Sequence, residues 1–159
     1  MIGVVDLKKY LYIIIMLLTI LLLSVYIYVK KITQSEKANY NYKNSILVQN
    51  DKIKESNINL NIQGTIEKRI VFGRGIEILK TFDGSIYMNK EKYNVNLGLT
   101  RDNIYFGNAF KDDTDNKTFT IFLSKDLKTI YLINDQYSCE IVSSKTIEEF
   151  RKIKEKFLK

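Results

Sequence analysis

The uncharged run of 20 residues from Tyr10 to Val29 constrains this chain more than any other feature. Only the hydroxyls of Thr19 and Ser24 interrupt its apolar side chains, and a helix turns such hydroxyls back onto its own carbonyl groups. At about 1.5 Å per residue the run forms a helix about 30 Å long, which matches the hydrocarbon layer of a bilayer. The sequence therefore predicts a transmembrane helix over residues 10–31, after a short tail of residues 1–9.

Tyrosines and lysines flank the run at both ends. Tyrosine rings prefer the headgroup level of a membrane, and lysines prefer the water beyond it. A cleaved signal peptide would have a shorter apolar region that ends in small residues, whereas residues 25–29 are bulky throughout. The sequence favours an uncleaved signal anchor, with these membrane-interface residues: Tyr10, Tyr12, Tyr26, Tyr28, Lys30 and Lys31.

The orientation of the anchor follows from two opposed arguments. Counting positive charges gives Lys8 and Lys9 before the run and Lys30, Lys31, Lys37 and Lys43 after it, which favours a cytoplasmic C-terminus. The first tail is short, however, and long C-terminal domains are translocated largely regardless of their charge. We expect the C-terminal domain on the outer side of the cell membrane, in a single-pass protein.

The net charge of +7 does not indicate nucleic-acid binding. Four lysines and one aspartate beside the run contribute +3, and the 21 basic and 17 acidic residues from Ile32 onward contribute the other +4. Those later charges are mixed in sign, with no basic cluster interleaved with aromatics, which is typical of a solvated surface. We expect the lipid bilayer, through residues 10–29, and an envelope protein as partners, and no nucleic acid.

Beyond the anchor the pattern changes twice. Residues 32–57 are polar and rich in Asn and Lys, which predicts a stalk, with Ile46 to Val48 as a possible edge strand. From Ile58 onward, short apolar-polar alternations separated by turn residues predict about eight strands. Turns are expected at Gly64, at Gly73 to Gly75 and at Asp83-Gly84.

The last segment, residues 146–158, has the pattern of a helix. Thr146 followed by Glu149 fits a capping box, and the apolar residues fall near one helical face: Ile147, Phe150, Ile153, Phe157 and Leu158. The helix is expected to cover the β domain, and a basic helix on anionic lipid is the alternative. The fold class is thus α+β: a transmembrane helix, then a small antiparallel barrel or sandwich in residues 58–159 with a C-terminal amphipathic helix.

Several residue types that carry chemistry are missing or poorly placed. The absence of His excludes Ser-His-Asp triads, Cys-His dyads and most zinc sites. Cys139 is the only Cys, so no disulfide forms within the chain, and alternation with Tyr137 and Ile141 predicts a buried thiol rather than a nucleophile. We expect no catalytic residue, metal or cofactor.

Two motifs that resemble ligand-binding loops are better explained as hairpin turns. Asp113 and Asp115 have the spacing of a calcium loop, but the sixth and twelfth positions hold Thr118 and Ser124 instead of Gly and Glu. A solvated hairpin loop is favoured over an irregular calcium site. Gly73 to Gly75 is expected to be a hairpin turn, since no third glycine or following helix would make it a phosphate loop.

The tyrosines of the predicted strands are expected in the core rather than around a ligand: Tyr87, Tyr93, Tyr105, Tyr131 and Tyr137. The composition, rich in Asn, Lys, Ile and Tyr, is typical of an AT-rich bacterial genome. Together these patterns predict a non-enzymatic, membrane-anchored binding module of the bacterial cell envelope. A lipid or small-ligand carrier, and an enzyme using Asp, Glu, Lys or Tyr, are the alternatives.

Overall fold

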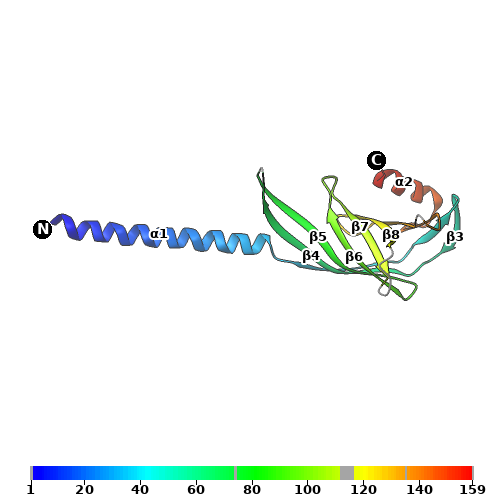
Figure 1. The fold of residues 1–159 in the computed structure, drawn as a ribbon, viewed down its shortest axis with the longest axis horizontal. Coiled ribbons are helices and arrows are strands. Elements are labelled where there is room, and N and C mark those ends of the chain that lie inside the picture. The colour runs from blue at the N-terminus through cyan, green and yellow to red at the C-terminus, as the bar shows by residue number, and fades with distance from the viewer. Residues whose placement is uncertain (1, 74, 112–116, 135, 159) are drawn as a thin grey trace. The chain divides into compact units, whose positions relative to one another are not determined.

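The first unit of the chain is one helix, α1 (Ile2–Ile32). The computed structural model describes residues 2–73, 75–111, 117–134 and 136–158, and the chain divides into two compact units, residues 1–34 and 35–159. The span Leu7–Ile32 of this helix (Figure 1) is long and apolar enough to cross a membrane, and no residue of its most apolar window is buried. The helix begins well before residue 10, because no Pro or turn sequence separates residues 2–9 from the apolar run.

The two hydroxyls within the apolar run are satisfied inside α1, as predicted. Thr19 Oγ1 donates to the carbonyl oxygen of Ile15 at 2.8 Å, and Ser24 Oγ donates to that of Leu21 at 2.7 Å. A helix that is apolar on all sides and whose few polar groups are hydrogen-bonded within the helix is suited to lipid rather than water.

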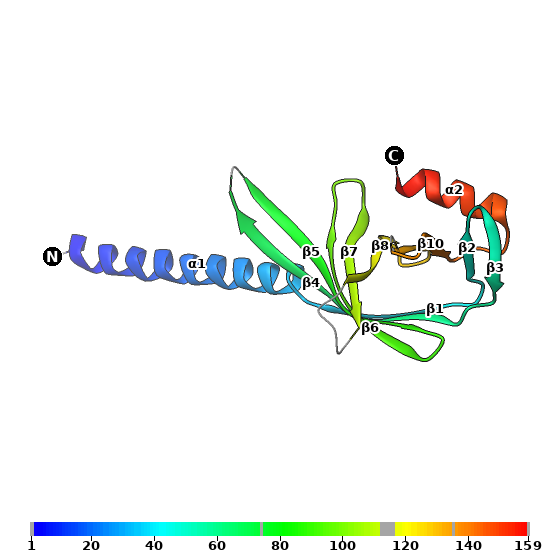
Figure 2. The same ribbon diagram turned by 45° about the vertical axis from the view of Figure 1, so that its right-hand side comes forward.

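The second unit contains one antiparallel sheet of ten strands (Figures 1 and 2). Across the sheet the order is β1-β4-β5-β6-β7-β8-β9-β10-β2-β3, so β1 and β3 are the edges. The strands are β1 (Glu36–Tyr42), β2 (Ile46–Gln49), β3 (Lys52–Ser56), β4 (Leu60–Phe72), β5 (Ile76–Met88), β6 (Glu91–Leu99), β7 (Ile104–Lys111), β8 (Lys117–Ser124), β9 (Ile130–Asn134) and β10 (Cys139–Val142).

The sheet curls into a half-barrel because of its connections. Strands β1 and β2 are separated by residues 43–45 alone, yet seven strands lie between them in the sheet. So short a link requires the two ends of the sheet to approach each other. The phenol of Tyr42 in β1 donates to the carbonyl oxygen of Leu127, in the β8–β9 loop, at 2.7 Å, which joins the two sides.

The concave face encloses an inner core to which eight strands contribute. Its largest fully buried members include Phe82 and Tyr105, at 0% and 1% exposure. Alternate residues of β6, Tyr93, Val95 and Leu97, point into this core while their neighbours face outward, as the period-two pattern predicts. The barrel interior is therefore filled by side chains.

A separate outer core lies on the opposite face of β8, β9, β10 and β2, beneath α2 (Ile147–Phe157). In β9, Ile130 and Leu132 face the inner core whereas Tyr131 faces Phe150 and Phe157 of α2, so both faces of this strand are covered. The predicted covering role of the helix is confirmed, although Leu158 lies just past its end and is 49% exposed.

The N-terminus of α2 is capped as the sequence predicts. The amide of Glu149 donates to Thr146 Oγ1 at 3.2 Å. The Glu149 carboxylate accepts from the amide of Lys145, one residue before the N-cap, at 2.9 Å. Two backbone donors that the helix leaves unpaired are thereby satisfied.

The polar segment predicted as a stalk, residues 32–57, instead holds the strands β1, β2 and β3. In β1 the buried residues Ala38 and Tyr42 and the half-buried Tyr40 alternate with Asn39 and Asn41, which face outward. Half of a strand at the edge of a curled sheet is solvated, so its composition is polar although its inward residues are core residues. The triplet Ile46 to Val48 does form a strand, β2, but an interior one.

Two predicted turns are also wrong. Gly64 lies within β4, and Asp83-Gly84 lies within β5, where Gly64 and Gly84 pair directly. A Cβ atom on Gly64 would lie 2.3 Å from the carbonyl oxygen of Asp83, and one on Gly84 would lie 2.2 Å from that of Gln63. These glycines permit close approach of two backbones rather than a reversal.

The actual reversals occur at other places. The predicted turn at residues 73–75 falls between β4 and β5, where the amide of Gly73 donates to the carbonyl oxygen of Gly75 at 3.0 Å, and Arg74 lies outside the described residues. The β5–β6 hairpin turns at Asn89 and Lys90, whose φ angles of 46° and 77° are in the left-handed region. A two-residue loop of this conformation matches the twist of the flanking strands.

Candidate functional site

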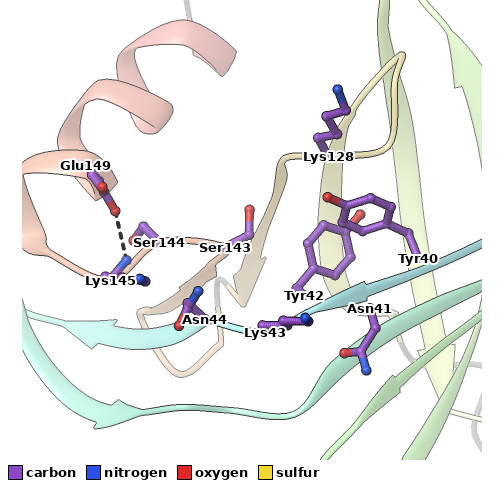
Figure 3. Close-up of a pocket in the computed structure, with 10 residues that line it drawn as sticks. All are labelled: Tyr40, Asn41, Tyr42, Lys43, Asn44, Lys128, Ser143, Ser144, Lys145 and Glu149. Atoms are coloured by element: carbon purple, nitrogen blue, oxygen red, sulfur yellow. Dashed lines mark hydrogen bonds between the residues drawn. The ribbon is translucent and has the colours of Figure 1, made fainter.

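A pocket of about 470 Å³ lies at the seam of the half-barrel (Figure 3). Three segments distant in sequence meet there: the end of β1 with the β1–β2 link, the β8–β9 loop, and the β10–α2 link. We call it the seam pocket, and its lining residues are Tyr40, Asn41, Tyr42, Lys43, Asn44, Lys128, Ser143, Ser144, Lys145 and Glu149.

Hydrogen bonds fix the walls of the seam pocket. Ser143 Oγ accepts from the amide of Ile130 at 3.0 Å, which joins β10 to β9. The rings of Tyr40 and Tyr42 pack with centroids 4.9 Å apart at 54° and form the aromatic side of the pocket (Figure 3). The pocket is thus built by the closure of the sheet and not by one local motif.

The charges of the seam pocket are mainly positive. Lys43, Lys128 and Lys145 line it, against the single carboxylate of Glu149. Lys128 Nζ lies 3.9 Å from an Asp126 carboxylate oxygen, and the ammonium groups of Lys43 and Lys145 have no partner among the described residues. Such a surface attracts an anionic or hydroxyl-rich group through exposed cations.

The titratable groups near the pocket do not suit acid-base catalysis at neutral pH. Burial, followed by the neighbouring Tyr40 and Asp126, raises the pKa of Tyr42, so its phenol stays protonated and donates to Leu127. The hydrogen bond from Ser124 lowers the pKa of Asp126, which stays ionised. Neither group has a pKa near the pH at which a general base works best.

Apolar side chains form a second unusual surface, at the end of the β4–β5 hairpin. Phe72 and Ile76, which pair across the two strands, are 78% and 74% exposed. Val71, Ile78 and Leu79 are each more than two-fifths exposed as well. Exposed apolar residues are common singly, whereas a cluster at one hairpin end indicates an interaction surface.

The predicted membrane-interface residues all lie on α1. Tyr10, Tyr12, Tyr26 and Tyr28 are each more than three-fifths exposed, and Lys30 and Lys31 occupy the last turn. The helix therefore presents these side chains to whatever surrounds it.

The other residues that the sequence singled out have mostly structural roles. Tyr93, Tyr105 and Tyr131 are buried, as expected, whereas Tyr87 is only half-buried, and Tyr137 lies in the β9–β10 turn and is 63% exposed. Cys139 is half-buried, and burial, followed by Glu140, raises the pKa of its thiol. A thiol that keeps its proton is a poor nucleophile.

The carboxylates considered for calcium, Asp113 and Asp115, lie outside the described residues. Among the described residues, no group of three or more Cys, Asp or Glu side chains is arranged to hold a metal ion.

The sequence indicated neither the seam pocket nor the exposed hairpin end. The pocket depends on the curl of the sheet, for which no local pattern exists. A signal for the hairpin end is present in the sequence, since "RIVF" and "IEIL" carry apolar residues at adjacent positions and therefore on both faces of a strand.

Comparisons with known proteins give no further guide to the site. No protein-family model, no curated protein and no solved structure matches this chain.

Proposed function

We propose that this protein is a non-enzymatic binding module, anchored by α1 in the bacterial cytoplasmic membrane, whose β domain works on the outer side. The anchor proposal rests on the exposed apolar span Leu7–Ile32. The binding proposal rests on one observation above all: the half-barrel is filled by its inner core, so its polar and charged groups meet ligands at the surface.

The two alternatives have less support. A carrier needs an enclosed apolar cavity, and side chains from eight strands occupy the interior of the half-barrel. An enzyme without His needs a pair of positioned acids or a nucleophile with a shifted pKa, and the Cys139 thiol and Tyr42 phenol are shifted toward the unreactive, protonated form.

The seam pocket is the proposed contact site for the envelope partner. Lys43 and Lys145 present unpaired ammonium groups, and Tyr40 adds an aromatic surface. Arrangements of this kind suit an acidic segment of a protein, because exposed cations speed association and select for opposite charge.

Thiol labelling tests topology and binding together. In a Cys139→Ala background, Lys43→Cys places a thiol in the seam pocket and Lys54→Cys places one on the exposed edge strand β3. A membrane-impermeant maleimide should label both variants in intact cells. Lys43→Cys should react more slowly in cells than in purified protein, because the partner covers it, whereas Lys54→Cys should show no such difference.

A third variant, Lys8→Cys, serves as the control on the other side of the membrane and should be labelled only after lysis. If the two domain variants also require lysis, the domain is cytoplasmic and the proposed location is wrong. If Lys43→Cys reacts equally fast in cells and in purified protein, the seam pocket is not the partner site.

A further inference from the structure

The end of the β4–β5 hairpin has no neighbouring strand. The pairing of β1 with β4 ends at Glu36 and Ile66, and the pairing of β6 with β5 ends at Gly98 and Thr81. Beyond these points, residues 67–72 pair only with β5 and residues 76–80 pair only with β4 in the described sheet, and we call these two segments the hairpin tip (Figures 1 and 2). An isolated two-stranded ribbon is marginally stable in water, so the hairpin tip requires a surface to pack against.

One face of the hairpin tip is a continuous apolar strip. Ile70 pairs with Ile78, and Phe72 pairs with Ile76, so four apolar side chains lie on the same side of the ribbon. The strip lies on the same face as Ile66 and Phe82, which pack in the inner core, and the Lys68–Lys80 pair separates the two apolar groups. In the strip, Phe72, Ile76 and Ile78 are 78%, 74% and 46% exposed.

Cations lie at the base of this strip. Lys68 and Lys80 are directly paired on the same face, and Arg69 lies on the other face with 74% of its side chain exposed. Lys68 binds Glu36, and Arg69 binds Glu67 at 2.7 Å. Apolar residues at the end of an element with long basic side chains behind them are the pattern of a segment that enters a membrane interface.

The chain connection makes a bilayer the surface within reach. Glu36, the residue that pairs with the base of the hairpin tip, is separated from the end of α1 by residues 33–35 alone. Three extended residues span about 10 Å, while the six residues from Glu67 to Phe72 extend about 20 Å. If α1 occupies a membrane, the tip is long enough to reach its surface.

The open strand edges of the hairpin tip limit how deeply the tip can enter a bilayer. Both strands of the hairpin tip carry backbone groups without partners on their outer sides, because β1 and β6 do not extend along it. Such groups are not tolerated in the hydrocarbon core, whereas the hydrated interface satisfies them.

We infer that the hairpin tip inserts its apolar side chains into the interface of the bilayer that holds α1, with Lys68, Arg69 and Lys80 at the headgroups. This inference rests on the proposed function, since it requires α1 to be in a membrane. The tip and α1 then form two contacts of one chain with one bilayer, and the domain does not rotate freely on its tether.

The absence of Trp from the chain allows a direct test. Phe72→Trp places the only indole of the full chain at the hairpin tip, and Tyr137→Trp places it in the β9–β10 turn, a similarly exposed site between strands that are distant from β4 and β5 in the sheet order. Each variant is reconstituted into vesicles of phosphatidylcholine and phosphatidylglycerol, with or without brominated acyl chains. Bromolipids should quench the fluorescence of Phe72→Trp at least twofold more than that of Tyr137→Trp.

Flotation of the vesicles separates the two proposals. Protein that fails to float with the vesicles lacks the anchor, and both proposals then fall. Protein that floats but shows equal quenching for the two variants overturns the inference alone and leaves the hairpin tip to a protein partner. Adding Ile76→Asp to Phe72→Trp should abolish the extra quenching without loss of flotation, whereas retained quenching would show that the tip's apolar strip does not make the contact.

Discussion

Two regions of the sheet differ in how their apolar side chains are covered. At β9, Tyr131 faces Phe150 and Phe157 of α2, and Phe150 is 1% exposed. In the hairpin tip, Phe72 has the same side chain but is 78% exposed. The chain therefore covers the apolar surface at β9 itself and leaves that of the hairpin tip exposed, which is why we propose an external surface for the tip.

The largest loss of folding stability should come from truncating a phenylalanine in the outer core. Phe150→Ala removes a ring from the outer core and should lower the free energy of unfolding by about 3–5 kcal/mol. Phe72→Ala should change it by less than about 0.5 kcal/mol in detergent. Thermal unfolding of the full chain, followed by near-UV circular dichroism, measures both, and equal losses would mean that the hairpin tip is covered by the chain itself.

The paired glycines at the root of the hairpin allow a second comparison. In Gly64→Ala the new methyl group would meet the Asp83 carbonyl oxygen at 2.3 Å, so the two strands must separate, at a cost of about 1–3 kcal/mol. Gly98→Ala on β6 is the matched control, since its Cβ would have no atom within 4 Å. The same unfolding measurement should find the control unchanged, and a loss in both variants would point to the backbone freedom of glycine instead of the close approach.

The smallest loss of folding stability should come from a substitution in the seam pocket. Tyr42→Phe removes the hydrogen bond to Leu127 and should cost about 1 kcal/mol at pH 7. Burial raises the pKa of Tyr42 above its usual value near 10, so the folded state keeps a proton that the unfolded state releases above pH 10. This contribution to stability is complete below pH 10 and decreases as the pH rises further.

Unfolding midpoints of the wild type and Tyr42→Phe, measured from pH 7 to pH 11, should therefore converge as the pH increases. Tyr137→Phe, in which the exposed Tyr137 of the β9–β10 turn is replaced, should follow the wild type throughout. A constant difference between wild type and Tyr42→Phe would show that the phenol is not held in its neutral form by the fold.

Elements with a strong local pattern were predictable. The apolar run of α1, the capping residues of α2 and the alternation in β6 each appear directly in the sequence, and the structure confirms these elements. Strand β1 was missed because its inward residues Ala38, Tyr40 and Tyr42 alternate with Asn and Lys residues, which have low strand propensity.

Pairings distant in sequence were not predictable. Asp83-Gly84 is a strong turn signal by itself, but in the sheet Gly84 is opposite Gly64, where both residues lack the Cβ that would clash. The seam pocket needs residues near positions 42, 128 and 144 to meet, which depends on the pairing of β2 with β10. No window of sequence shorter than the domain contains that information.

The pairing of β2 with β10 also determines when the domain can be completed. Ile46 pairs with Val142, so β2 must wait for a strand that is made much later in synthesis. Contacts between such distant residues slow folding, and the unpaired early strands are exposed to aggregation in the meantime. The pairing of β2 with β10 therefore forms only after residue 142 has been made, and a product truncated before residue 139 leaves β2 paired with β3 alone.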